Sequence, residues 1–123
     1  DPSIRVTGFV EDIRPFVLSS AVYVVPLRIG SGTRLKILEA MAMGKAIVST
    51  TVGAEGIEVT DGKDIFIADD PREFADRVID LLKNPDKRKA MGLNGRKLVE
   101  QKYTWEVIGE KLEQDIQSVF KKA

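Results

Sequence analysis

The sequence contains no cysteine and no histidine among its 123 residues. Without cysteine the chain forms no disulfide bond and offers neither a thiolate ligand nor a thiol nucleophile. Without histidine it lacks the commonest general base and the commonest metal ligand. Any chemistry therefore depends on carboxylates, cations, hydroxyl groups, backbone amides or the substrate itself.

Net charge and long apolar runs are missing as well. The 19 basic residues balance the 19 acidic residues, which argues against a nucleic-acid partner. No apolar run approaches the roughly 20 residues that cross a bilayer, and Asp1 opens the sequence without a basic or apolar leader. We therefore expect a cytoplasmic protein, with peripheral attachment at the inner membrane face as an option for a full-length parent.

Composition and pattern predict one α/β domain. The chain is 43% hydrophobic and 31% charged, which is ordinary for a globular protein with one core. Short β-branched runs alternate with helical patterns, as in folds with a parallel sheet. Strands are predicted at Ile4–Val10, Ala21–Leu27, Ala46–Thr50 and Ile65–Ala68. Helices are predicted at Ile13–Ser20, Leu35–Met43, Arg72–Lys83, Asp86–Tyr103 and Trp105–Lys121.

A small-residue turn separates the strand Ala21–Leu27 from the helix after it. The start of a helix exposes backbone N–H groups and the positive end of the helix dipole, so it attracts phosphate. Glycine lets the backbone approach an anion, and serine or threonine can cap the helix or donate a hydroxyl. Arg34 and Lys36 are expected to place two cations beside the same point. The turn residues are Gly30, Ser31, Gly32 and Thr33.

Glu39 is a lone carboxylate in a helix that is otherwise apolar on nearly every side, as in a helix buried between layers. It lies roughly 9 Å along the helix from Thr33, which is about the distance from a diphosphate to the ribose hydroxyls of a nucleotide. One interpretation is a ribose contact. The alternative is that Glu39 pairs with Arg34 or Lys36, or faces solvent at the helix edge.

The run LEAMAMGKAIVST, Leu38 to Thr50, resembles the signature E-x7-E-A-M-A-x-G-x-P-V-V-A-S. This signature belongs to retaining glycosyltransferases of the GT-B fold, the glycosyl transferases group 1 or family four. The upstream VTGFVED and the downstream segments from TTVGAEG to RKLVEQKYTWEVIGEKL resemble the same domain in the same order. The resemblance covers essentially the whole chain and implies a donor-binding C-terminal domain in which Glu39 binds the ribose of a nucleotide sugar.

The resemblance also implies contacts from two loops. The loop at Gly8 would border the donor base, whereas a simple strand kink is the alternative. The loop from Gly53 to Gly56 would lie beside the transferred sugar and the diphosphate. Glu55 would match a common carboxylate there, whereas a solvated loop residue is the alternative.

One position departs from the family pattern. The first glutamate of the signature should fall near Ser31, but no acidic residue occurs between Leu27 and Leu38. The contact to the donor sugar therefore stays unassigned.

The sequence is also too short for a complete domain of this type, which has about six parallel strands in the order 3-2-1-4-5-6. The four predicted strands correspond to the third to sixth, so we expect an incomplete, Rossmann-like, three-layer fragment with C-terminal helices. Ala21–Leu27 would then carry an unpaired edge that invites association. Either Ile4–Val10 pairs with it directly, or a second molecule does so by dimerisation or strand exchange.

The expected function is transfer of a sugar from a nucleotide diphosphate donor, with retention of configuration, to an acceptor bound by a missing N-terminal domain. No tightly bound cofactor or metal is expected, and the chain alone should be inactive because one substrate site is absent. A non-catalytic nucleotide-binding or interaction module with the same fold is the alternative.

Overall fold

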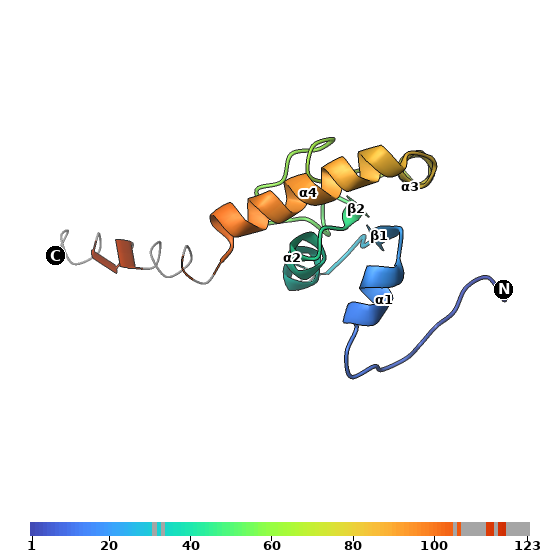
Figure 1. The fold of residues 1–123 in the computed structure, drawn as a ribbon, viewed down its shortest axis with the longest axis horizontal. Coiled ribbons are helices and arrows are strands. Elements are labelled where there is room, and N and C mark those ends of the chain that lie inside the picture. The colour runs from blue at the N-terminus through green and yellow to red at the C-terminus, as the bar shows by residue number, and fades with distance from the viewer. Residues whose placement is uncertain (31, 33, 105, 107–112, 115, 118–123) are drawn as a thin grey trace.

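The computed structural model describes residues 1–30, 32, 34–104, 106, 113–114 and 116–117. Helices and strands are interspersed along this part of the chain, in the order α1, β1, α2, β2, β3, α3, α4, which confirms the α/β class (Figure 1). The helices are α1 (Arg14–Ser19), α2 (Arg34–Ala42), α3 (Pro71–Lys83) and α4 (Pro85–Lys102). The strands are β1 (Val22–Val25), β2 (Ala46–Ser49) and β3 (Phe66–Ile67).

The described strands form one parallel sheet in the order β1-β2-β3. Val25 lies opposite Ser49, and Ser49 lies opposite Ile67, so the carboxyl ends of the strands meet at one edge. β2 is the central strand and is buried along its whole length. Ligands of open parallel sheets bind at this carboxyl edge, which makes the loops after the strands the first place to look for a site.

Two apolar clusters cover the two faces of the sheet and give the predicted three layers. On one face, Ile47 of β2 packs with Ile37 and Met41 of α2 and with Leu98 of α4. On the other face, Val48 packs with Phe66, with Leu81 of α3 and with Met91 near the start of α4. Because neighbouring residues of a strand point to opposite faces, both faces of β2 contribute to the core.

Two glycines in α4 make the contact between α4 and α2 possible. A Cβ atom added at Gly92 would lie 1.9 Å from the carbonyl oxygen of Gly44, in the turn that ends α2. At Gly95 the added atom would lie 3.3 Å from the Met41 side chain. Both glycines weaken a helix prediction made from local propensity. Here close packing against α2 and the turn that ends it explains why they stand in an 18-residue helix.

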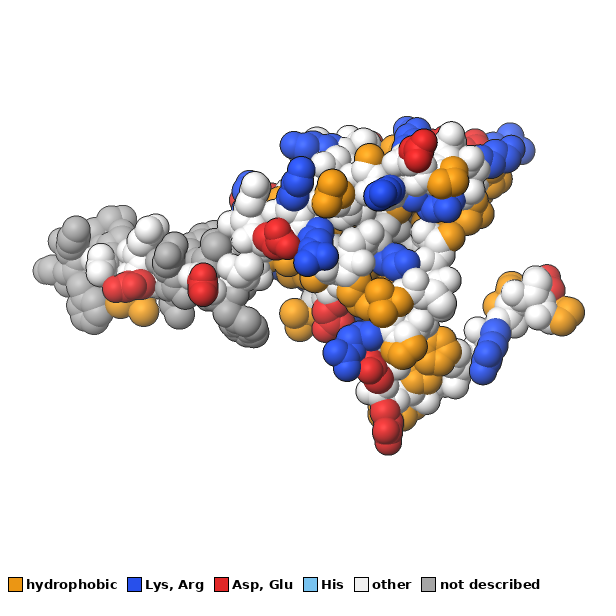
Figure 2. All heavy atoms as spheres, viewed as in Figure 1, with side chains coloured by type: hydrophobic (Ala, Val, Ile, Leu, Met, Phe, Trp, Pro, Cys, Tyr) orange, Lys and Arg blue, Asp and Glu red, His pale blue; other side chains and the backbone are white. Residues whose placement is uncertain are grey.

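The predicted strand at Ile4–Val10 is not formed. Residues 1–10 are all described, and none of them belongs to a strand. They extend away from the body of the molecule, and the side chain of Phe9 is 92% exposed (Figures 1 and 2). A strand needs a neighbour for its N–H and C=O groups, whereas the apolar pattern that predicts it is local. Within the described chain β1 is the outer strand of the sheet, and residues 4–10 do not pair with its open edge, so the direct pairing of Ile4–Val10 with this strand is not realised.

The predicted helices agree with the structure more closely than the predicted N-terminal strand does. α1, α3 and α4 lie within a residue or so of the predicted ranges, and α3 is capped by the Asp70 carboxylate, which accepts the Glu73 N–H at 3.0 Å. α2 is buried on one side only, because Leu35 and Ala42 are exposed, so the expectation of a helix enclosed between layers is wrong.

The predicted closing helix, Trp105–Lys121, falls for the most part outside the described residues. No described helix has the length and apolarity of a membrane span.

Candidate functional site

The loops at the carboxyl edge of the sheet are held together by two consecutive threonines. Thr50 donates its backbone N–H to the carbonyl oxygen of Val25 at 3.2 Å and its hydroxyl to the carbonyl oxygen of Leu27. Thr51 donates its N–H and its hydroxyl to the Asp69 carboxylate at 2.8 and 2.6 Å. The loops after β1, β2 and β3 therefore form one connected edge. No local pattern predicts these bonds, because their partners are 18 to 25 residues apart.

The predicted small-residue turn leads directly into α2. Gly30 has φ 122° and Gly32 has φ 88°, a conformation that glycine adopts without strain. Ser31 and Thr33, the two hydroxyl residues of the predicted anion site, lie outside the described residues. The strand, turn and helix order of the sequence interpretation is thus present, with Arg34 as the first helical residue.

The second predicted loop, after β2, divides into a buried and an exposed part. A Cβ atom at Gly53 would lie 2.5 Å from the Ser49 hydroxyl and 2.9 Å from a Val25 methyl group, so glycine is required for packing at the strand ends. Glu55 is exposed and lines a cavity of about 410 Å³ together with Thr51 and Ile67. The sequence prediction grouped these two positions, whereas the structure gives Gly53 a packing role and leaves Glu55 facing solvent.

Glu39 faces a separate cavity of about 450 Å³ between α1 and α2. Within the described chain no hydrogen bond or ion pair of its carboxylate is found, so the alternative that Arg34 or Lys36 neutralises it is not realised. The residue is exposed, as the other alternative, a carboxylate facing solvent at the helix edge, predicted. Tyr23 of β1 lies beside it: burial raises the pKa of the Tyr23 phenol, and the negative charge of Glu39 raises it further. The remaining wall comes from residues 11–14 and 17, among them the carboxylates of Glu11 and Asp12, and on the α2 side from Lys36, Ala40, Ala42 and Met43.

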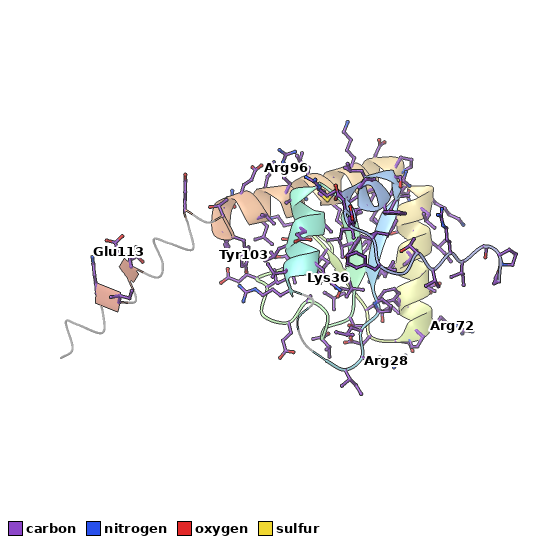
Figure 3. All side chains as sticks on the ribbon, turned by 90° about the horizontal axis from the view of Figure 1, so that it is seen from below. Arg28, Lys36, Arg72, Arg96, Tyr103 and Glu113 are labelled. Atoms are coloured by element: carbon purple, nitrogen blue, oxygen red, sulfur yellow. The ribbon has the colours of Figure 1, made fainter. Side chains whose placement is uncertain are left out.

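Arg34 and Lys36 do not lie beside the same point, contrary to the sequence prediction. The Arg34 guanidinium stacks over the Tyr103 ring, 5.5 Å from its centroid, and lies 3.8 Å from the position of a Cβ atom at Gly56. Lys36 instead lines the cavity of Glu39. Two residues along a helix turn the side chain by about 200°, so such neighbours face different ways. Figure 3 shows Lys36 on α2 and Tyr103 at the end of α4.

The structure thus brings together Lys36, Glu39 and Tyr23, of which the sequence singled out the first two. Tyr23 was missed because it is one of several aromatic and β-branched residues of a buried-type strand. Gly8 has φ 67° with no atom within 4 Å of an added Cβ, and it does not line the cavity. Among the described residues no group of three acidic side chains is placed to hold a metal ion.

The family model of glycosyl transferases group 1 matches residues 1–84. The chain belongs to this family. A GDP-mannose-dependent monoacylated α-(1-6)-phosphatidylinositol monomannoside mannosyltransferase of Corynebacterium glutamicum is 34% identical over 88 residues, which are 71% of this chain and 23% of that protein. An uncharacterised glycosyltransferase of Methanocaldococcus jannaschii is 30% identical over 98 residues, or 78% of this chain and 27% of that protein.

Solved structures agree with this membership of the glycosyl transferases group 1. The C-terminal domain of a glycosyl transferase group 1 protein, LpcC of Francisella tularensis, superposes with a TM-score of 0.71 at 26% identity, over 80% of this chain and 52% of that one. The resemblance to a GT-B C-terminal domain is therefore confirmed. The chain spans about a quarter of the length of these curated relatives.

Proposed function

We propose that this chain is the donor-binding part of a glycosyltransferase that moves a sugar from a nucleotide diphosphate to an acceptor with retention of configuration. The observation that carries the proposal is the unpaired Glu39 carboxylate at the cavity between α1 and α2. The acceptor would bind to a domain that this chain does not include. Family membership supports sugar transfer in general, and the curated mannosyltransferase relative supports a nucleotide-sugar donor.

The cavity suits one nucleoside. Its volume of about 450 Å³ lies in the range of small-molecule sites. Ile13 and Val17 offer an apolar wall for a base, while the Glu39 carboxylate can accept hydrogen bonds from both hydroxyls of a ribose. Glu39 is exposed at the mouth of the cavity, and a cis-diol would supply its carboxylate with two uncharged donors. Glu39 is therefore assigned to the ribose.

The diphosphate would lie toward the start of α2. Lys36 stands three residues before Glu39, about 4.5 Å along the helix and on the same face. Its ammonium, together with the backbone amides at the start of α2, would stabilise the negative charge that builds on the diphosphate as its bond to the sugar breaks. Arg34 would act from the opposite side of α2, next to the loop that holds Gly53 and Glu55. No side chain of this chain is assigned as nucleophile or base, and no tightly bound metal is required.

One sequence feature favours a second function, nucleotide binding without turnover. The family signature has an acidic residue near Ser31, and none occurs between Leu27 and Leu38. A module of this kind would retain nucleotide affinity and lack transfer activity even when joined to an acceptor domain. An activity screen against nucleotide sugars with a protein that includes both domains separates the two functions.

The chain alone would also associate through its sheet edge. No described strand pairs with the outer edge of β1, and a groove of about 280 Å³ lined by Lys36 and residues 23–27 runs beside it. Residues 4–10 of the same chain are extended and unpaired, with Val6 and Phe9 exposed. Two copies can satisfy both features if the N-terminal segment of one pairs with β1 of the other.

The donor site is tested by titrating uridine and guanosine diphosphates into the chain by calorimetry. Glu39→Gln should weaken binding by about 1.5 to 3 kcal/mol, the value of a hydrogen bond to a charged group. Asp76→Asn on the exposed face of α3 removes the same charge far from the cavity and should leave affinity unchanged. Equal affinity of wild type and Glu39→Gln would remove the assignment, and absence of binding to a protein that includes the upstream strands would favour an interaction module.

A further inference from the structure

Lys45 connects the two walls of the cavity that holds Glu39. Its ammonium donates hydrogen bonds to the carbonyl oxygens of Leu18 and Ser20, at 2.9 and 2.7 Å. Both acceptors belong to the C-terminal end of α1, more than 24 residues earlier in the chain. The backbone N–H of Lys45 donates to the carbonyl oxygen of Ala40 at 3.1 Å, and Ala40 lies on the cavity wall formed by α2.

The position of Lys45 is fixed by its own neighbours in the chain. Gly44, at φ 73°, ends α2 and donates its N–H to Met41 at 2.9 Å. Ala46 begins β2 directly opposite Val22, the first residue of β1. Lys45 therefore stands where the end of α2 meets the amino ends of both strands. Because α1 finishes only a few residues before β1, the ammonium reaches the last turn of α1 from this fixed base.

α1 has few other anchors. It spans six residues, and Val17 is its buried side chain; at its N-terminal end the Asp12 carboxylate accepts the Arg14 N–H at 3.0 Å, a contact between residues two apart that does not tie α1 to the sheet. The last carbonyl groups of a helix lack partners within the helix, and a cation there also complements the helix dipole. The Ser20 hydroxyl donates a hydrogen bond to the carbonyl oxygen of Phe16 at 2.7 Å, and the carbonyl oxygens of Leu18 and Ser20 accept hydrogen bonds from Lys45.

We infer that Lys45 is a positioning residue of the nucleotide site, which fixes the distance between α1 and Glu39 without touching the ligand. The inference rests on the proposed donor function, since the cavity between α1 and α2 is the site in question. α1 and the residue before it supply Ile13, Arg14 and Val17 to the wall opposite Glu39. When the two hydrogen bonds are lost, α1 moves relative to α2, and a nucleoside must order it again on binding.

The test uses nuclear magnetic resonance titration of guanosine and uridine diphosphates into the chain, with backbone relaxation of residues 14–20 measured on the same samples. Lys45→Met keeps the aliphatic stem and removes the donors. We expect it to weaken nucleotide binding about tenfold and to lower the order of α1 amides, while β2 and α4 amides and the thermal midpoint stay close to wild type. Lys45→Arg keeps two donors and should recover most of the affinity.

Lys89→Met is the matched control, because Lys89 is exposed on α4 and does not line the cavity. Wild-type affinity in Lys45→Met would overturn the positioning role, and so would a loss of order throughout the sheet, which indicates a general stabilising role instead. If wild type binds neither nucleotide, the proposed function fails. The relaxation of the α1 amides then still tests whether Lys45 anchors α1. Unchanged relaxation in Lys45→Met would reject the anchoring role as well.

Discussion

The centre of the sheet and residues 1–27 contain the same kinds of apolar residue, but these side chains are buried in the first region and largely exposed in the second. Around β2, β3, α3 and α4, apolar side chains such as Ile47, Ile65 and Leu81 are completely buried. In residues 1–27, apolar side chains such as Ile4, Val6 and Phe9 are largely exposed. The difference is one of neighbours, since the first region is enclosed by layers on both faces and the second borders an open edge. An apolar pattern therefore predicts which residues can be buried. The neighbouring helices and strands determine which of them are buried in the folded chain.

The largest difference between the two regions should be in the effect of truncating a leucine. Leu81 on α3 is 0% exposed, and Leu18 on α1 is 60% exposed. Leu81→Ala should lower the free energy of unfolding by about 2 to 5 kcal/mol, because it leaves a cavity in the core. Leu18→Ala, the same change at a helical surface position, should alter it by no more than about 0.5 kcal/mol. Urea unfolding followed by circular dichroism measures both, and similar losses would mean that α1 is packed as tightly as α3.

Association is expected to depend on the N-terminal region alone. Val24 at the edge of β1 and Ile79 on α3 are each 46% exposed. Val24→Lys should convert a dimer of the chain into a monomer, because a lysine on an edge strand opposes pairing with a second strand. Ile79→Lys adds the same charge at an equally exposed position on α3, outside the sheet edge, and should leave the dimer intact. Sedimentation equilibrium at several concentrations distinguishes them, and a wild-type chain that stays monomeric throughout would contradict the proposed edge pairing.

The smallest expected effect concerns two carboxylates whose pKa values are lowered. Hydrogen bonds from Thr51 lower the pKa of Asp69, and those from Arg14 lower the pKa of Asp12. A folded-state pKa below the unfolded value of about 3.9 gives stability that is present above that value and is lost as the pH falls through the folded-state pKa. The Asp69 contact joins residues 18 apart, whereas the Asp12 contact joins residues two apart and can persist in the unfolded chain.

Asp69→Asn should therefore reduce the loss of stability between pH 5 and pH 2, to a small extent because the side chain is exposed. Asp12→Asn should leave the pH dependence near that of wild type. Thermal unfolding measured at intervals across this range compares the two variants. An equal change in both would show that the tertiary contact of Asp69 adds nothing to the local one.

Local chemistry explains which parts of the fold could be predicted. The alternation of β-branched runs with helical patterns predicted α1, β1, α2, β2, α3 and α4, because helix periodicity and caps such as Asp70 act within a few residues. The strand at Ile4–Val10 was wrong because pairing requires a distant partner. The combination of Arg34 with Lys36 was wrong because closeness in sequence was taken as closeness on the helix surface. Tyr23 and Lys45 escaped notice because their partners lie on other elements.

The sequence by itself determined the family, the strand, turn and helix order around Gly30 and the presence of a lone acid at Glu39, since each is written in consecutive residues. Only the tertiary structure decided that Glu39 shares its cavity with Tyr23 and Lys36, that Arg34 turns to Tyr103, and that Lys45 ties α1 to α2. These contacts join residues many positions apart, so they form and stabilise the fold only once the sheet and its helices have assembled.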